Sequence, residues 1–417
     1  MLAMLWLAPA IALHAGDPAF NFARVSSFVA PPDLTIYSNT AVLTLTNCTD
    51  TNYFYTIQSS TNLQDWITDP YNYFFAARSP GQTLTAYAVA TGDICFYRAV
   101  TVPIRPIPLF KYAIAAGTNI NINGKNFRAD SYDSSDTNYS TYLTNGFTGT
   151  NGIWIYGAGK AKSGGDVATD TAVKGSLNLG NGTIYGHLFT GPGAEADVVQ
   201  MGPHGTVGDL AWAASNEGIE GDGTPTSWWQ TNFNVTFPTL RAPTFSGTAL
   251  PAVTTTGVYA GFIVIPQGSG ISNFVVTLLP SSPIWVVGNA TLWVKGSALA
   301  SIRIAATNNA SLDLYVGTTS GNGDTISILG TGGSNLNQPG YARNLRIFGL
   351  PSLNAIDMHG NAGWAACVYA PNADVLAGGA GNNVQDAAGA LVVRSFTLKG
   401  HFNLHYDESL KANGPTY

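Results

Sequence analysis

Apolar and polar residues alternate along much of this chain, with the period of two that is typical of β-strands. Residues 31–101 contain the alternating stretches AVLTLTN, FYTIQSS, LTAYAVA and ICFYRAV, with clusters of turn-forming residues between them. Such alternation indicates strands that bury one face. We therefore predict a small β-sandwich-like module over residues 31–101.

The pattern changes at residue 110 and then continues to residue 417. Short apolar runs are followed by Gly, Asn or Asp, as in PIWVVGNATLWVKG (283–296) and ALVVRSFTLKGHFNLHY (390–406). These three residue types tolerate left-handed corners, and short strands joined by small corners are what a coiled β-solenoid requires. We predict an all-β protein whose residues 110–417 form a right-handed parallel β-helix. A two-sheet sandwich is the alternative that the pattern leaves open.

The composition excludes one class of partner and marks a domain boundary. Charged residues make up only 10% of the chain, Lys and Arg total 18, and the net charge is −6. Nucleic-acid binding needs clustered basic side chains, so we expect no nucleic-acid partner. The segment TVPIRPIPL carries three prolines, which favours an extended linker over residues 102–109.

The first residues have the pattern of an export signal. Residues 1–15 are almost wholly apolar and contain small residues suited to cleavage, although no Lys or Arg precedes the apolar core. We predict a signal peptide over residues 1–15 and a leader over 16–30; a buried first strand or helix is the alternative. The later apolar stretch at 261–280 is broken by Pro and Gly, so we expect no transmembrane span. The expected location is extracytoplasmic: secreted, cell-surface or periplasmic.

The chain contains three cysteines. Cys48 and Cys95 lie in the strand-rich first region, and a disulfide between them fits an exported protein. Two separate buried thiols are the alternative. Cys367 lies in an apolar run, which favours a core position.

Two resemblances to bacterial exported proteins add to this interpretation. YTIQSSTNLQDW (55–66) and CFYRAV (95–100) resemble a small β-module that is repeated in many such proteins. That module has no assigned chemistry, so the resemblance implies extracellular architecture and no activity.

The second resemblance covers most of the chain after the linker. The matching pieces are KYAIAAGTNININGKNFRADSYDSSD (111–136), GNGTIYGHLFTGPGA (180–194), GTVGDLAW (205–212), WVVGNATLWVKG (285–296), GLPSLNAIDMHGNAGWAACVYAPNADV (349–375) and GHFNLHYDESL (400–410). They resemble a domain of exported bacterial proteins, some of which are minor components of type IV pili of the PilX sort. The resemblance implies a solenoid-like fold and, by association, a surface or pilus role. This chain has no pilin-type N-terminal helix, which puts pilus assembly itself in doubt.

Three carboxylates form a candidate calcium site. Asp130, Asp133 and Asp136 are spaced three apart with hydroxyl side chains between them, and calcium prefers several oxygen ligands. The spacing is not that of an EF-hand. A solvated, turn-forming loop is the alternative, and we expect no other cofactor.

Two further groups are candidates for ligand binding. His405, Asp407 and Glu408 lie together near the end of the sequence, where a histidine beside carboxylates could act as acid and base. The alternative is that this segment caps the last rung. Trp228 and Trp229 could stack on sugar rings if exposed; a satellite core under a long loop is their alternative.

These observations favour an exported structural or adhesive surface protein, associated with pili or the envelope, with an envelope component or a polysaccharide as partner. We assign no catalytic residue, since the carboxylates are scattered and no GxSxG, HExxH or P-loop motif occurs. The alternative is a carbohydrate-binding or carbohydrate-active β-helix protein, such as a polysaccharide lyase or hydrolase, which would need carboxylates converging along a groove.

Overall fold

The structure is a computed structural model, and the chain's contacts divide it into two units, Met1–Ile107 and Pro108–Tyr417. It describes residues 40–48, 53–60, 67–68, 75–76, 82–89, 96–103 and 108–415, the last range apart from gaps at 123–126, 145–151, 225, 236, 269, 280–281, 297, 300–301, 305–309, 322, 328–336, 338–339, 360–362 and 379–383. The predicted signal peptide and leader, residues 1–15 and 16–30, lie outside the described residues.

The described strands of the first unit pair only antiparallel. They are β1 (Thr40–Cys48), β2 (Tyr53–Ser60), β3 (Ile67–Thr68), β4 (Phe75–Ala76), β5 (Gln82–Val89) and β6 (Phe96–Pro103). β1 pairs with β5, while β2 pairs with β3, β4 and β6. Because β6 ends at Pro103, strand pairing continues into the segment that the sequence assigned to the linker.

The second unit is a parallel β-helix built from two arms. The strands of the first arm are β7 (Ile114–Ala116), β8 (Ile120–Asn121), β9 (Phe127–Tyr132), β12 (Val167–Thr169), β13 (Leu177–Gly180), β14 (Thr183–Tyr185), β15 (Leu188–Phe189), β16 (Val199–Met201), β17 (Thr206–Gly208), β18 (Gly218–Ile219) and β19 (Trp229–Gln230). Those of the second arm are β20 (Ile263–Ile265), β21 (Ile271–Val276), β22 (Ile284–Val286), β23 (Asn289–Val294), β24 (Ala298–Leu299), β25 (Ile302–Ile304), β26 (Ser311–Val316), β27 (Asp324–Ser327), β28 (Leu345–Gly349), β29 (Leu353–His359), β30 (Trp364–Gly378), β31 (Val384–Leu398) and β32 (His401–Asp407).

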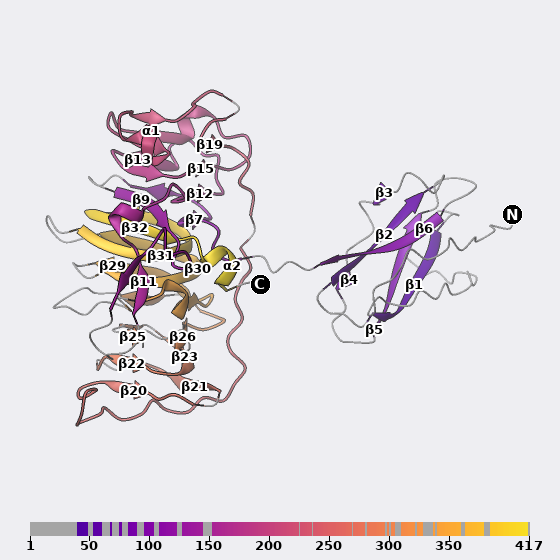
Figure 1. Ribbon diagram of the computed structural model, residues 1–417. Helices are drawn as coiled ribbons and strands as arrows, with labels where there is room; N and C mark the ends of the chain where they lie inside the picture. Colours follow the sequence, from indigo (N-terminus) through magenta and orange to yellow (C-terminus); the bar gives the residue numbers. More distant parts are fainter. Residues whose placement is uncertain are drawn as a thin grey trace. The chain divides into compact units, whose positions relative to one another are not determined.

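The order of the rungs in space differs from their order in the sequence. One ladder of parallel pairs runs β19–β15–β12–β7–β31–β30–β28–β26–β23–β21. The first arm therefore starts in the middle of the solenoid and runs to one end (Figure 1). The second arm starts at the opposite end and returns to the middle, where β31 and β32 pair with β7, β8 and β9. The first and last strands of the second unit along the sequence therefore pair with each other in the middle of the stack, an arrangement that we call closure of the solenoid.

An uninterrupted inner row of side chains shows that the two arms share one core. Successive members of this row are neighbours in the strand register: Phe274, Leu292, Leu314, Ile347, Val368, Leu391, Ile114, Val167 and Leu188. All of them are buried. The row crosses from the second arm to the first between Leu391 and Ile114, so burial of apolar surface stabilises this junction as it stabilises every other rung. The predicted all-β fold with a β-helix is confirmed, and the two-sheet sandwich is not what forms.

A strap, residues 231–262, carries the chain along the outside of the solenoid from one end to the other (Figure 1). Phe233 is buried and packs edge-to-face on Tyr112, which precedes β7, with 5.3 Å between ring centroids. Farther along, the Tyr369 hydroxyl donates to the Pro238 carbonyl over 2.8 Å. At the far end, Thr248 forms a parallel bridge with the second arm. The strap thus covers outward apolar side chains of both arms.

Helices contribute little to the described chain. α1 (Leu210–Ala213) and α2 (Leu410–Asn413) are each a single turn. Among the described residues, no helix has the length and apolar character needed to cross a membrane.

Candidate functional site

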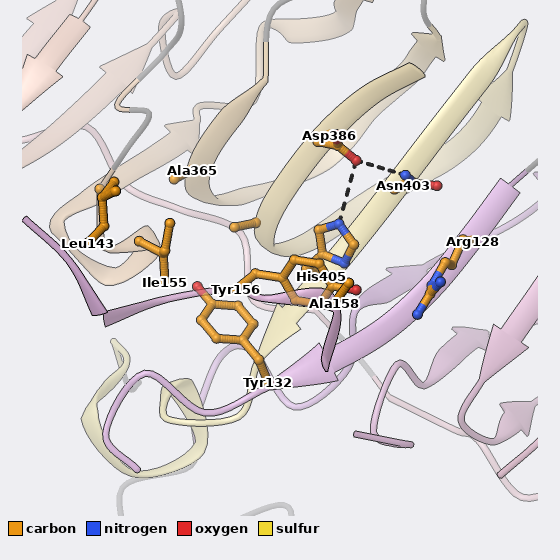
Figure 2. A pocket seen from close by; sticks show the side chains of 12 residues that line it. Arg128, Tyr132, Leu143, Ile155, Tyr156, Ala158, Ala365, Asp386, Asn403 and His405 are labelled. Carbon is orange, nitrogen blue, oxygen red and sulfur yellow. Dashed lines mark hydrogen bonds and ion pairs between the residues drawn. The ribbon is translucent and has the colours of Figure 1, made fainter. Parts of the chain in front are cut away.

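A hairpin lies over the outer face of the sheet where the two arms meet and encloses a pocket of about 570 Å³ (Figure 2). The hairpin pairs β10 (Thr141–Leu143) with β11 (Ile153–Ile155), antiparallel, in the excursion between β9 and β12. The pocket is lined by Arg128, Tyr132, Leu143, Ile155, Tyr156, Ala158, Gly340, Ala365, Asp386, Ala388, Asn403 and His405. The polar wall of the pocket, formed by Arg128, Asp386, Asn403 and His405, therefore combines residues from the beginning and the end of the second unit's sequence.

The strand register brings the polar lining residues together. On the outer face, Asn403 of β32 lies between Asp386 of β31 and Arg128 of β9. Two residues farther along β32, His405 lies beside Asp130. Neighbouring strands are about 4.8 Å apart, so side chains that are remote in sequence touch here because the last rung pairs with the first.

Asp130 is the centre of the polar network. Its side chain is fully buried, and its carboxylate accepts hydrogen bonds from Arg128 Nε over 2.8 Å, Tyr156 Oη over 2.9 Å and His405 Nδ1 over 2.5 Å. A buried carboxylate is stable only when its lone pairs are satisfied and its charge is compensated. Three donors, one of them always cationic, meet that requirement.

His405 is held between two carboxylates and against an aromatic ring. Its Nε2 lies 3.6 Å from Asp386 Oδ1, and its ring stacks on Tyr156 with centroids 3.4 Å apart. Burial acts to lower the pKa of His405, but the hydrogen bonds and negative charges of Asp130 and Asp386 outweigh burial, and the net shift is upward. His405 therefore favours the imidazolium form.

The neighbours of His405 are shifted in matching directions. The hydrogen bond with His405 lowers the pKa of Asp386, against an opposing effect of burial, and Asn403 Nδ2 also donates to that carboxylate over 2.7 Å. Burial and then the charge of Asp130 raise the pKa of Tyr156. The shifts of His405 and Asp386 thus both favour the ion pair between them, while the phenol of Tyr156 stays neutral.

The other half of the pocket is apolar. Ala365 and Ala388 form a small-residue floor beside Tyr132. Leu143 and Ile155 lie on the hairpin side of the pocket (Figure 2). The Tyr132 side chain is almost fully buried, with 1% of its surface exposed. Within the part of the chain that the structure describes, its hydroxyl makes no hydrogen bond, although it lines the pocket. This hydroxyl is therefore available to a ligand that enters the pocket.

Of the three C-terminal candidates, only His405 lines the pocket. Asp407 is buried and accepts from Ser134 N over 3.0 Å and Ser134 Oγ over 2.7 Å. Burial raises its pKa despite these hydrogen bonds. Glu408 accepts from Ser131 Oγ over 2.7 Å and pairs with Lys162. Asp407 thus joins the end of β32 to the loop that follows β9, and Glu408 joins it to Ser131 of β9 itself and to Lys162.

The three candidate calcium ligands do not converge. Asp130 belongs to the pocket network described above. Asp133 accepts from the backbone and the hydroxyl of Ser135, and Asp136 accepts from the backbone of Asn138 over 2.8 Å. Each of the last two closes its own turn. In the described ranges, no group of three or more His, Cys, Asp or Glu side chains is placed to hold a metal ion.

Trp228 and Trp229 lie at the outer end of the first arm, away from the pocket lining. Both are half-buried and pack against the core. Trp228 stacks on His187 with centroids 4.2 Å apart, and Trp229 Nε1 donates to Thr190 Oγ1 over 3.0 Å. Cys48 ends β1, but its side chain and all of Cys95 lie outside what the structure describes, so their disulfide stays a prediction. Cys367 is a buried free thiol, as its apolar run indicates.

Several lining residues were not among the sequence candidates: Arg128, Tyr132, Tyr156, Asp386 and Asn403. A local signal existed for some of them. In HFNLHYD the polar residues occupy alternate positions and therefore share the outward face of the strand. No local signal indicates that this strand pairs with FRADSY, because that pairing joins opposite ends of the unit.

Comparison with protein families gives one match. A model described as a domain of unknown function (DUF7305) matches residues 283–413. The matched range runs from β22 to α2 and includes Asp386, Asn403 and His405, whereas Arg128, Asp130 and Tyr156 lie outside it. Searches of curated proteins and of solved structures found no match. The chain is thus similar, over residues 283–413, to a domain whose description gives no function.

Proposed function

We propose that this chain is an extracytoplasmic structural or adhesive protein of the cell surface, attached to pili or other envelope components, that binds partners without catalysis. The observation that carries the proposal is the closure of the solenoid. β32 pairs with the whole length of β9, from Phe402 beside Phe127 to Asp407 beside Tyr132.

Closure matters because solenoids lose order from their ends. Each rung contacts only its neighbours, so a terminal rung is the least supported. Here the ends of the solenoid are made from internal segments, and Leu109 N donates to the Pro415 carbonyl over 3.0 Å near the middle. The first and last strands of the second unit cannot detach from the stack without breaking contacts with both arms. Resistance of this kind suits a protein exposed to proteases and shear outside the cell.

The pocket supports binding more than catalysis. A general base must have a lone pair available to the substrate, with a pKa near the working pH. Asp130 is occupied by three donors and His405 favours its protonated form. The Cys367 thiol is buried, and burial raises its pKa, which disfavours the thiolate needed for a nucleophile.

The test combines location, resistance and activity. Cells expressing the full chain are labelled with an antibody before and after lysis, and the purified full chain is treated with proteinase K. We expect labelling of intact cells and one resistant fragment that spans the second unit. Labelling only after lysis contradicts the proposed location, and rapid degradation of the second unit contradicts the structural role. Release of reducing ends or unsaturated products from a polysaccharide panel would show that the chain is an enzyme.

A further inference from the structure

The pocket under the hairpin combines two features that together indicate a ligand. It has about 570 Å³ of space, within the roughly 300–1,000 Å³ typical of small-molecule sites. It also exposes the hydroxyl of Tyr132, which has no hydrogen-bond partner among the described residues although its side chain is 1% exposed. We infer that this pocket binds a neutral saccharide, with a sugar hydroxyl bonded to Tyr132 Oη.

The two halves of the pocket match the two aspects of a sugar ring. A pyranose presents C–H groups on its face and hydroxyls around its edge. Tyr132, Ala365 and Ala388 offer an apolar surface. Asn403 and Asp386 offer an amide and a carboxylate at another part of the lining (Figure 2). Hydroxyls act as donor and acceptor at once, so they can serve the Asp386 acceptor and the phenol of Tyr132 together.

Charge balance favours a neutral ligand. Two basic side chains, Arg128 and His405, face two carboxyl side chains, Asp130 and Asp386, so the polar wall has no excess of basic or acidic groups. The charges are also paired: Arg128 with Asp130, and His405 with both carboxylates. An anionic or cationic ligand would have to break one of these pairs, at the cost of leaving a partly buried charge uncompensated. A neutral polyol leaves them intact.

A substitution that fills the pocket tests the site independently of the Tyr132 hydroxyl. Ala388 lies on the pocket floor between Ala365 and His405 in the strand register. A phenylalanine side chain at this position projects from the same outer face into the space that the ligand needs. Loss of binding in Ala388→Phe locates the ligand in the pocket independently of the Tyr132 hydroxyl.

This inference goes beyond the structural role and does not depend on it, since binding is measured on the purified full chain. The probes are cellotetraose, maltotetraose, xylotetraose and chitotetraose as neutral saccharides, with tetragalacturonate as the anionic comparison. Saturation-transfer NMR detects weak binding, and calorimetry gives the dissociation constant. The variants are Tyr132→Phe, Ala388→Phe and, as the matched control, Tyr369→Phe, which removes a tyrosine hydroxyl that bonds the strap.

We expect at least one neutral tetrasaccharide to bind. Tyr132→Phe should weaken binding about two- to tenfold, the range for one neutral hydrogen bond, with no loss of thermal stability. Ala388→Phe should abolish binding, and Tyr369→Phe should leave it unchanged. The inference is overturned if no neutral saccharide binds, if tetragalacturonate binds more tightly than all of them, or if Tyr132→Phe binds as tightly as the unaltered chain. Should Ala388→Phe fail to fold, Tyr132→Phe still decides, because its removed hydroxyl has no partner to lose.

Discussion

Replacing Asp130 by Asn removes the charge at the centre of the closing rung while keeping the shape of the side chain. The carboxylate is fully buried and bonds Arg128, Tyr156 and His405. An asparagine keeps one acceptor oxygen and turns an amide N–H₂ toward groups that are themselves donors. The substitution therefore leaves two cationic side chains without their shared counter-charge.

The magnitude follows from this arrangement. Removing one partner of a buried ion pair typically costs about 3–5 kcal/mol. Here His405 can release its proton and the remaining oxygen still accepts one hydrogen bond, so we expect the lower end, about 3 kcal/mol. The matched control is Asp374→Asn, which breaks an exposed pair with Arg394 and should cost about 0–1 kcal/mol.

The assay is chemical denaturation of the purified chain at about pH 6, where His405 is charged. A double-mutant cycle with His405→Gln separates the pair from its surroundings, and contacting residues of this kind give coupling energies of about 1–3 kcal/mol. The reasoning is refuted if Asp130→Asn costs no more than Asp374→Asn, or if the cycle shows no coupling between Asp130 and His405.

Three further predictions concern the same region. Because the folded pKa of His405 is raised, its stabilising contribution is complete below about pH 6.5 and declines as pH rises through the folded pKa; the unfolding free energy should therefore fall as pH rises above about 6.5 in the unaltered chain and stay flatter in His405→Gln. Phe402→Ala, at a fully buried ring stacked 6.3 Å from Phe127, should cost about 3–5 kcal/mol in denaturant titrations, and a cost below about 1 kcal/mol would contradict the closed core. The Cys367 thiol, buried and with a raised pKa, should react with iodoacetamide only after unfolding, and peptide mapping that finds it modified in the native chain would be inconsistent with its position.

The sequence predicts the strands and corners of this protein but not their order in space. Period-two alternation and corner residues are local, so runs such as WVVGNATLWVKG indicate stacked strands directly. The junction between Leu391 and Ile114 is different, because either residue would fit any inner position of the solenoid equally well. Nothing in the local pattern distinguishes an end rung from a middle rung, so the sequence does not predict that the second arm stacks below the first.

The candidate site, too, could be predicted from local sequence only in part. His405 could be singled out because a histidine beside carboxylates is chemically conspicuous, yet the carboxylates that contact it are Asp130 and Asp386 and not its neighbours in sequence. Asp407 instead bonds Ser134 in the loop after β9, and Glu408 bonds Ser131 of β9. The composition of the segment predicted where polar chemistry lies on the chain, while the partners were set by the long-range register.

Closure of the solenoid is the central claim, and amide hydrogen exchange of the purified chain, read by mass spectrometry, tests it most directly. If β32 pairs with β9 in the middle of the stack, residues 401–407 and 127–132 should exchange slowly and together with β31, more slowly than β21 at the end of the second arm. If residues 401–407 instead exchange as fast as the strands at the ends of the stack, the last rung is not held between the arms and the account is contradicted.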